Sequence, residues 1–147
     1  MEVLLANINH LESLSVLFDQ YRIFYNQVSN LDAAQEFLKD RFKNNDSVVF
    51  AANDNGQLVG FTQLYPSFSS VSMKRVWILN DLYVEESYRR RGIAKLLMNA
   101  AEEYAKESGA IRVILSTQTS NMTAQKLYEA RNYIKNEEFY YYALQLQ

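Results

Sequence analysis

The sequence predicts one α/β domain, with a mixed, mostly antiparallel central sheet of six or seven strands and helices on both faces. The spacing of apolar residues alternates along the chain between that of a strand and that of a helix. The resulting order is β, α, α, β, β, β, α, β, α, with one or two strands at the end. The 147 residues, 48% of them hydrophobic, suffice for one core, and no linker, repeat or low-complexity segment divides them.

The N-terminal half predicts a strand, two helices and a hairpin. Residues 2–6 are a short apolar run. Apolar residues at helical spacing follow as far as Phe24 or Tyr25, with Asn7 or Asn9 as the cap, and again over residues 31–42, with Ser29 or Asn30 as the cap. Two further strands, residues 47–53 and 57–65, are joined by Asn55-Gly56, a strong signal for a tight hairpin. We expect Pro66 to end the second of these strands and a flexible connection to follow over residues 67–73.

The centre of the sequence combines a strand, a basic turn and a helix. Residues 74–84 form an apolar strand, and helical spacing begins at Gly92 and ends at Gly109. The turn between them holds Arg89, Arg90 and Arg91. The first N–H groups of a helix lack partners and carry partial positive charge, so this turn predicts a site suited to phosphate. A helix start with merely solvated arginines is the alternative that these residues leave open.

The C-terminal part predicts a strand over residues 111–117, a short helix over about 121–131 and one or two strands within 133–145. Phe139, Tyr140, Tyr141 and Tyr142 place large aromatic side chains on both sides of the last segment. A monomer covers only one such side, so the run favours a contact in a homodimer, with an edge strand as the alternative.

Composition narrows the classes of function. The net charge of −2 and the pI of about 5.4 give no overall attraction to nucleic acid or to anionic membranes, so the arginine cluster suits a phosphorylated small molecule better. The absence of cysteine excludes a cysteine nucleophile and thiolate metal sites, and a single histidine excludes a multi-histidine site. Without a signal segment or a run of about 18 apolar residues, we expect a soluble, cytoplasmic protein with no bound metal.

Two motifs resemble the acetyl-CoA site of the GCN5-related N-acetyltransferase (GNAT) superfamily. Arg89-x-x-Gly92-x-Ala94 fits the superfamily's turn, Gln/Arg-x-x-Gly-x-Gly/Ala, and it follows a strand and opens a helix. An Asn121-x-x-Ala-x-x-Leu-Tyr128 run follows at the expected later place, and the element order is similar over the whole chain. Residues 79–84 are also similar to polyamine (diamine) acetyltransferases and to small yeast-type polyamine, histone and D-amino-acid acetyltransferases. The resemblance implies a single N-acetyltransferase domain, residues 1–147, with acetyl-CoA as co-substrate.

The resemblance also implies which residues hold the cofactor. The main chain of residues 82–84 would bond the pantetheine and the acetyl carbonyl, and the N–H groups of residues 90–95 would hold the pyrophosphate. Asn121 would contact the pantetheine arm, and Tyr128 would lie beside the sulfur. The implied cofactor-binding residues are Leu82, Tyr83, Val84, Arg89, Arg90, Arg91, Gly92, Ile93, Ala94, Lys95, Asn121 and Tyr128.

Tyr128 has the chemistry of a general acid for acetyl transfer from a thioester. A phenol with a pKa of about 10 can protonate or hydrogen-bond a departing thiolate, whose conjugate acid has a pKa near 8.5. A half-buried tyrosine on the helix face shared with Ala124 and Leu127 is the alternative that spacing alone leaves open.

Asn80 stands where polyamine acetyltransferases carry the glutamate that takes the proton of the amine. Asparagine has no useful basicity, so we assign it to positioning the acceptor, with the proton passing to water or through Asp81, Glu85 or Glu86. Deprotonating a lysine-like amine at pH 7 costs roughly 4.6 kcal/mol, against about 1 kcal/mol for an α-amino group. We therefore expect a small-molecule acceptor with a modestly basic primary amine, such as an amino acid or an amino-acid-like amine, while the resemblance to polyamine acetyltransferases keeps a polyamine open. A protein lysine as acceptor and a catalytically silent acyl-CoA-binding module stay open.

The acceptor itself has four candidate contacts, Tyr21, Tyr25, Asn80 and Asp81. The two tyrosines end the first helix and can line the mouth of a pocket, although packing in the core and its rim is the simpler interpretation. Strand alternation places Asn80 and Asp81 on opposite sides, so Asp81 reaches the acceptor only if the strand bulges. A carboxylate in an apolar strand is more simply a structural group with hydrogen-bonding partners.

Overall fold

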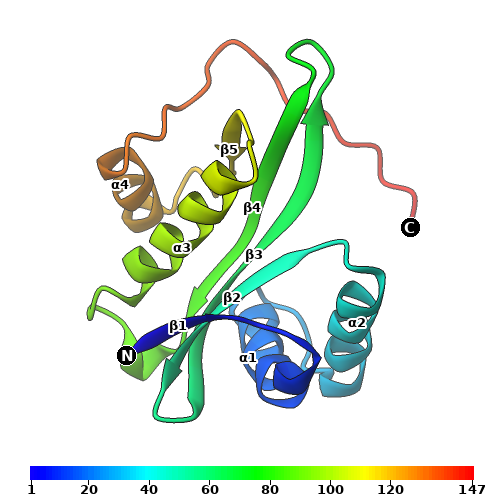
Figure 1. Ribbon diagram of the computed structural model, residues 1–147, viewed down its shortest axis with the longest axis vertical. Helices are drawn as coiled ribbons and strands as arrows, with labels where there is room; N and C mark the ends of the chain where they lie inside the picture. Colours follow the sequence, from blue (N-terminus) through cyan, green and yellow to red (C-terminus); the bar gives the residue numbers. More distant parts are fainter. The chain divides into compact units, whose positions relative to one another are not determined.

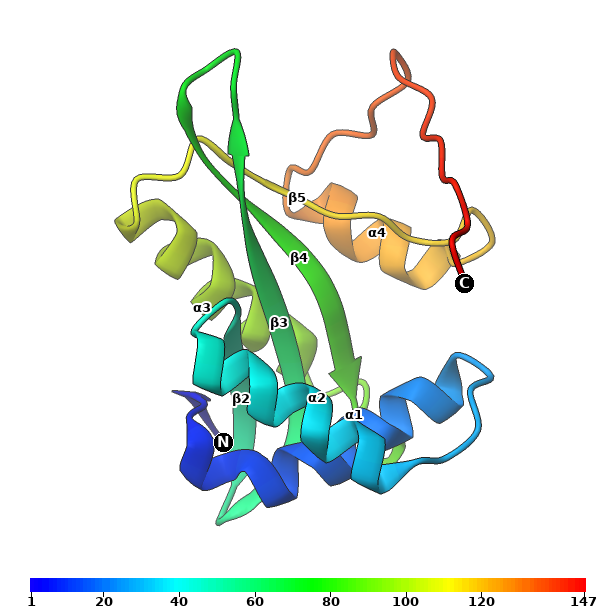
Figure 2. The same ribbon diagram turned by 90° about the vertical axis from the view of Figure 1, so that its right-hand side faces the viewer.

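The computed structural model describes residues 1–147 and divides into two units, residues 1–115 and residues 116–147. The N-terminal unit holds a five-stranded sheet and three α-helices, and the C-terminal unit holds one α-helix followed by an extended chain (Figure 1, Figure 2). The elements of the N-terminal unit are β1 (Glu2–Leu5), η1 (Ile8–His10), α1 (Leu11–Phe24), α2 (Leu31–Asn44), β2 (Val48–Asp54), β3 (Gln57–Ser69), β4 (Lys74–Val84), η2 (Glu86–Tyr88), α3 (Ile93–Glu107) and β5 (Arg112–Ile114). In the C-terminal unit, α4 spans Met122–Ala130.

The sheet is mixed. Its strands lie in the order β1-β2-β3-β4-β5, with antiparallel pairing from β1 to β4 and parallel pairing between β4 and β5. It has five strands, so the prediction of six or seven was wrong, because residues 133–145 form no strand. A strand forms only where its backbone N–H and C=O groups pair with a neighbour, and the composition of a segment does not show whether that neighbour exists.

β3 is longer than predicted. It continues through Pro66, which pairs with Trp77 of β4, and ends at Ser69. β2 accompanies β3 only as far as Leu64, so Pro66 lies where one edge of β3 is open, a position at which a sheet tolerates proline. The flexible connection predicted over residues 67–73 is therefore a short turn over residues 70–73.

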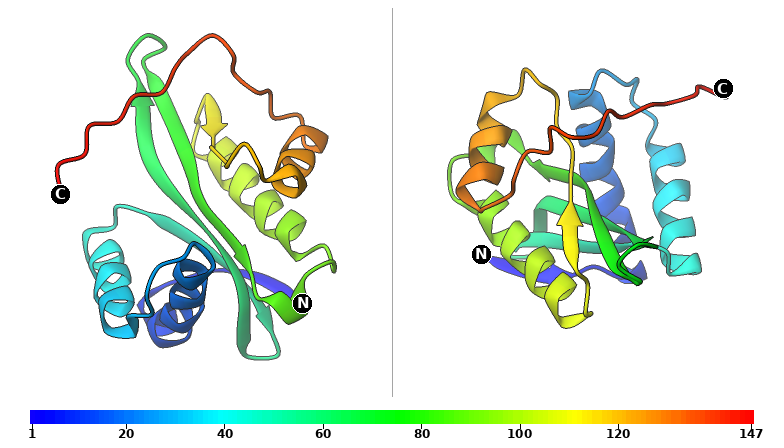
Figure 3. Two further views of the ribbon diagram at one scale, coloured as in Figure 1. Left: turned by 180° about the vertical axis from the view of Figure 1, so that it is seen from behind. Right: turned by 90° about the horizontal axis from the view of Figure 1, so that it is seen from above.

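Helices cover both faces of the sheet in the N-terminal unit, as predicted (Figure 3). α1 and α2 contribute Leu14 and Leu38 to a core that includes Phe61 of β3. On the other face, Leu97 of α3 packs in a second cluster with Val84 of β4. No helix has both the length and the apolar composition needed to cross a membrane.

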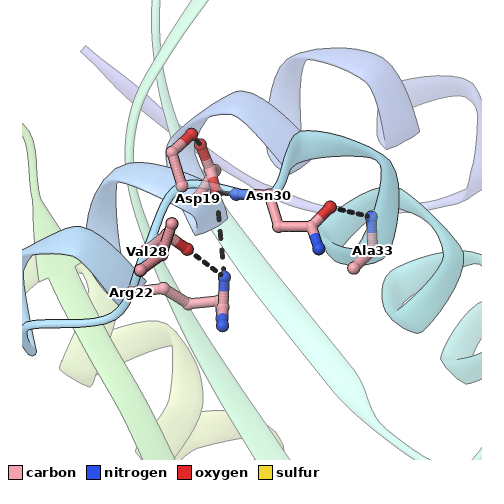
Figure 4. Close-up of polar contacts among 6 residues, drawn as sticks. Asp19, Arg22, Val28, Asn30 and Ala33 are labelled. Atoms are coloured by element: carbon pink, nitrogen blue, oxygen red, sulfur yellow. Dashed lines mark hydrogen bonds and ion pairs between the residues drawn. The ribbon is translucent and has the colours of Figure 1, made fainter.

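One buried carboxylate fixes the connection between α1 and α2. Asp19 accepts hydrogen bonds from the Ser29 hydroxyl at 2.6 Å and from the Asn30 N–H at 2.8 Å, and Arg22 lies 3.9 Å from the same carboxylate (Figure 4). Asn30 also caps α2, because its Oδ1 accepts from the Ala33 N–H at 3.1 Å. The Ser29 bond, then the Asn30 bond, and then Arg22 lower the pKa of Asp19, whereas burial opposes them.

Candidate functional site

The turn before α3 presents a row of unpaired main-chain N–H groups. Arg90 and Gly92 have left-handed backbone conformations, with φ of 66° and 79°, and α3 begins after Gly92 without a side-chain cap. The N–H groups of residues 90–95 donate to no acceptor in the chain, and the first helical bond runs from the Leu96 N–H to the Gly92 carbonyl at 3.2 Å. These donors gather at the positive end of a 15-residue helix, an arrangement that binds anions.

Three cations of the motif lie at the surface around this turn. Arg90, Arg91 and Lys95 are exposed, and none of them forms an ion pair with a carboxylate. The Arg91 guanidinium lies 5.0 Å from the centre of the Tyr88 ring. Their positive charge is therefore not neutralised within the chain.

Arg89 points toward α1 instead. Its Nε donates to the Val84 carbonyl at 2.8 Å. Its guanidinium lies over the rings of Phe24 and Tyr83, at 5.2 and 5.5 Å from their centres. Arg89 thereby connects the end of β4 to the C-terminal end of α1, and it makes no ion pair.

β4 loses its neighbour on one side at the stretch where the cofactor is predicted to bind. β5 pairs only with residues 76–78 of β4, so the edge of β4 beyond Ile78 has no strand beside it. Leu82, Tyr83 and Val84 lie on this free stretch while they pair with β3 on the other side. Main-chain groups on the free edge are therefore available to a ligand that runs along the strand.

A β-bulge displaces Asn80 from the regular pairing. Asp81 pairs with Gln63 and Leu79 pairs with Leu64, so Asn80 has no opposite residue on β3. Asn80 is exposed, and its Nδ2 donates to Asp81 Oδ1 at 3.1 Å. Strict alternation places these two side chains on opposite sides of the strand unless the strand bulges, and the register shows a bulge at this position.

Asp81 is a buried carboxylate surrounded by neutral donors. The Tyr21 hydroxyl donates to its Oδ1 at 2.8 Å and Gln63 Nε2 donates to its Oδ2 at 3.0 Å, in addition to the bond from Asn80. Asp81 forms no ion pair with a lysine or an arginine. Burial and then the Asp81 charge raise the pKa of Tyr21 above its ordinary range, and the same two causes raise the pKa of Tyr65 to about 12. These contacts support a structural role for Asp81.

A cavity of about 470 Å³ opens beside the end of α1. It is lined by Gln20, Ile23, Phe24, Tyr83, Glu86 and Arg89. Tyr21 and Tyr25 are not among the lining residues. Their rings lie edge to face at 5.1 Å, with Tyr21 half-buried and Tyr25 exposed. The Tyr21 hydroxyl is used by Asp81.

Two features of this region were not predicted, the buried amide of Gln63 and the contact between Phe24 and Arg89. Gln63 is fully buried in β3. Its only signal in the sequence is an amide within a largely apolar strand, because a buried amide needs a hydrogen-bonding partner. The contact of Phe24 with Arg89 depends on how α1 packs on the sheet, and it leaves no signal in the sequence.

The two remaining predicted residues belong to the C-terminal unit. Asn121 caps α4, because its Oδ1 accepts from the Ala124 N–H at 3.1 Å. Tyr128 is half-buried on α4, with its ring centre 6.1 Å from that of Tyr133. No group of three or more His, Asp or Glu side chains in the chain is placed to hold a metal ion. The N-terminal unit thus brings together the turn, the free strand edge and the Asp81 network, and α4 carries Asn121 and Tyr128.

Comparison with known proteins agrees with the motifs. The model of the Acetyltransferase (GNAT) family matches residues 13–133. The chain is 44% identical over 144 residues to an uncharacterised N-acetyltransferase, YhfO, of Bacillus subtilis (strain 168), with 98% of this chain and 97% of YhfO covered. The crystal structure of a probable acetyltransferase, 42% identical, matches 100% of this chain and 99% of its own with a TM-score of 0.95.

A more distant neighbour shares the fold. AAC(6')-Iy, an aminoglycoside N-acetyltransferase solved in complex with CoA, is 22% identical and matches with a TM-score of 0.81, covering 98% of this chain and 94% of its own. The finer resemblance to polyamine and D-amino-acid acetyltransferases stays a prediction. The match over residues 13–133 and the full-length likeness to YhfO make this chain a member of the acetyltransferase (GNAT) family and an N-acetyltransferase.

Proposed function

We propose that the enzyme transfers an acetyl group from acetyl-CoA to the primary amine of a small molecule, by direct attack in a ternary complex. The observation that carries this proposal is the row of unpaired N–H groups at residues 90–95, in the same unit as the free edge of β4. The unpaired N–H groups suit a diphosphate, and the free edge of β4 suits an extended pantetheine arm.

The charge and space around the turn support a coenzyme A thioester as donor. Arg90, Arg91 and Lys95 add positive charge to the N–H groups. A Cβ placed on Gly92 would meet no protein atom within 4 Å, so there is room for a ligand against the backbone. AAC(6')-Iy, which shares the fold, has been solved with CoA.

The thioester would lie along residues 82–84. A main-chain N–H on the free edge of β4 would donate to the acetyl carbonyl and stabilise the oxyanion of the tetrahedral intermediate, a contribution that is usually large in acyl transfer. The bond from Arg89 Nε to the Val84 carbonyl holds the last residue of this stretch in place.

The neutral amine attacks the thioester carbonyl, so that a C–N bond forms and the C–S bond breaks. We assign Tyr128 as the general acid that gives its proton to the departing thiolate, and Asn121 as a contact of the pantetheine arm. Asn80 positions the amine, whose nitrogen loses one proton after the attack, either to water or through Glu85 or Glu86, and Tyr128 regains a proton from solvent. The products are the N-acetylated amine and CoA.

The residues proposed to contact the acceptor favour a small amine of modest basicity. Position 80 offers an amide in place of a carboxylate base, which favours an amine that is already partly neutral at pH 7. The cavity of about 470 Å³ beside α1 has a size typical of small-molecule sites, and its wall carries both a cation, Arg89, and an anion, Glu86. Such a wall suits an amino acid or an amino-acid-like zwitterion.

The C-terminal segment, residues 139–146, supports a homodimer. Its large side chains are exposed by 77% or more, and these are Phe139, Tyr140, Tyr141, Tyr142, Leu144 and Leu146. Single exposed apolar residues are ordinary, but six within eight positions mark a contact surface. Aromatic residues are also enriched at the centres of protein interfaces.

Two measurements test the proposed reaction. Calorimetry with acetyl-CoA should show saturable binding, and thiol release should be faster with α-amino acids than with spermidine or an Nα-blocked lysine. A strong preference for spermidine would contradict the acceptor class, and release with a lysine peptide alone would indicate a protein substrate. Binding without thiol release for any amine would indicate a silent binding module.

A further inference from the structure

The Asp81 carboxylate determines how two neighbouring amides are oriented. Asn80 Nδ2 donates to its Oδ1 at 3.1 Å, and Gln63 Nε2 donates to its Oδ2 at 3.0 Å. A carboxylate accepts hydrogen bonds and has none to donate, so each amide must turn its nitrogen toward Asp81. A flip of either amide would place two oxygens face to face. The carbonyl oxygens of both amides therefore point away from Asp81.

The two amides differ in what their oxygens can reach. Gln63 is fully buried, and its Oε1 has no hydrogen-bond donor in the chain. Asn80 is exposed, because the bulge leaves it without an opposite residue on β3. Of the two oxygens that Asp81 orients, only Asn80 Oδ1 is thus accessible to a molecule that arrives from solvent.

We propose that Asp81 is a positioning residue that holds Asn80 Oδ1 as a hydrogen-bond acceptor for an N–H of the acceptor amine. This inference rests on the proposed function and names the group that recognises the amine. A primary amine that attacks through its lone pair still has two N–H bonds, and one of them donates to Asn80 Oδ1. Tyr21 keeps Asp81 in place from α1 through its 2.8 Å hydrogen bond. A fully substituted amine has no N–H for this contact.

A double-mutant cycle tests the inference in the full-length enzyme. Asp81→Asn lets the Asn80 amide flip, and Asn80→Ala removes that amide. Each substitution should raise KM for the amine by about five- to tenfold, with the Kd of acetyl-CoA unchanged. If Asp81 acts through Asn80, the double variant should be no worse than Asn80→Ala alone. Multiplied effects of the two substitutions would overturn the proposal.

Gln63→Leu is the matched control, because it also removes one hydrogen bond from Asp81 but leaves the bond to Asn80. It should lower the melting temperature as Asp81→Asn does, while KM for the amine stays at the wild-type value. A KM increase with Gln63→Leu equal to that with Asp81→Asn would show that Asp81 matters only for general stability and would overturn the proposal.

A measurement on the wild-type protein needs neither turnover nor a stable variant. The Asn80 side-chain amide should give a rigid NMR signal, with an order parameter near that of the backbone, whereas a value below about 0.6 would show that no orientation is held and would overturn the inference. Failure of the proposed function is a different result, since it would appear as the absence of thiol release with every amine.

Discussion

The Tyr21 hydroxyl on α1 donates a 2.8 Å hydrogen bond to Asp81 Oδ1 on β4, next to the bulge at Asn80. This bond connects a helix to the strand 60 residues further along the chain. It also supplies one of only three donors to a buried carboxylate that has no cation partner.

Replacing Tyr21 by Phe should therefore destabilise the fold. The substitution keeps the ring but removes a donor from a buried anion, and we expect the free energy of unfolding to fall by about 1.5 kcal/mol in urea titrations. Tyr25→Phe is the control, because Tyr25 is exposed and its hydroxyl makes no hydrogen bond in the chain. Equal losses for the two variants would mean that the bond to Asp81 contributes nothing.

Gly92→Ala and Gly109→Ala form a matched pair at the two ends of α3. Both glycines have φ of 79°, and a Cβ at either would meet no protein atom within 4 Å. Each alanine should destabilise the fold by about 1 kcal/mol, because a side chain disfavours the left-handed conformation. Only Gly92→Ala should weaken acetyl-CoA binding in calorimetry, by tenfold or more, because its methyl group occupies space needed by the diphosphate. Equal affinities in the two variants would place the coenzyme elsewhere.

Asp19→Asn should make stability less dependent on pH in the acid range. The pKa of Asp19 is lowered in the folded state, so its contribution is present at neutral pH and is lost as the pH falls through that lowered value. We expect the variant to melt about 5 °C lower than wild type at pH 7, with the difference shrinking below about pH 4. Glu36→Gln, at an exposed position on α2, is the control and should show no such difference. A gap that persists unchanged at low pH would refute the role of the charge.

Tyr128→Phe tests the general acid. Loss of a general acid typically lowers kcat by about 10²- to 10⁴-fold, and acetyl-CoA binding should not change because the ring remains. Tyr133→Phe removes a hydroxyl from the ring beside it on the same unit and should leave kcat within about twofold of wild type. A similar kcat for Tyr128→Phe and wild type would assign protonation of the thiolate to another group.

The homodimer is tested by making the C-terminal segment polar. Tyr141→Ser together with Leu144→Ser should shift the mass measured by light scattering from that of two chains to that of one, because the contact surface loses its apolar centre. Val71→Ser is the control for the general effect of removing an exposed apolar side chain, because Val71 lies in the turn between β3 and β4. A wild-type mass of 17.1 kDa at all concentrations would show a monomer.

Much of the N-terminal unit could be predicted because its signals are local. The Asn55-Gly56 hairpin, the strand over residues 74–84 and the helix start after Gly92 all depend on residues adjacent in sequence, and all were confirmed. The bulge at Asn80 was not predicted, because it arises from the register between β3 and β4 rather than from β4 itself. The same reason explains the wrong strand count, since aromatic composition favours a strand at residues 139–142 but provides it with no neighbour.

The anion site proposed for the turn before α3 is built from main-chain N–H groups, which every amino acid except proline possesses. An alanine scan through residues 90–95 would therefore leave all of these donors in place, so it would reveal the arginine and lysine charges and the space beside Gly92 but not the N–H groups themselves. A proline scan would remove the donors one at a time. Substitutions of side chains alone would thus understate the contribution of this turn, which in our proposal binds the coenzyme through its main chain.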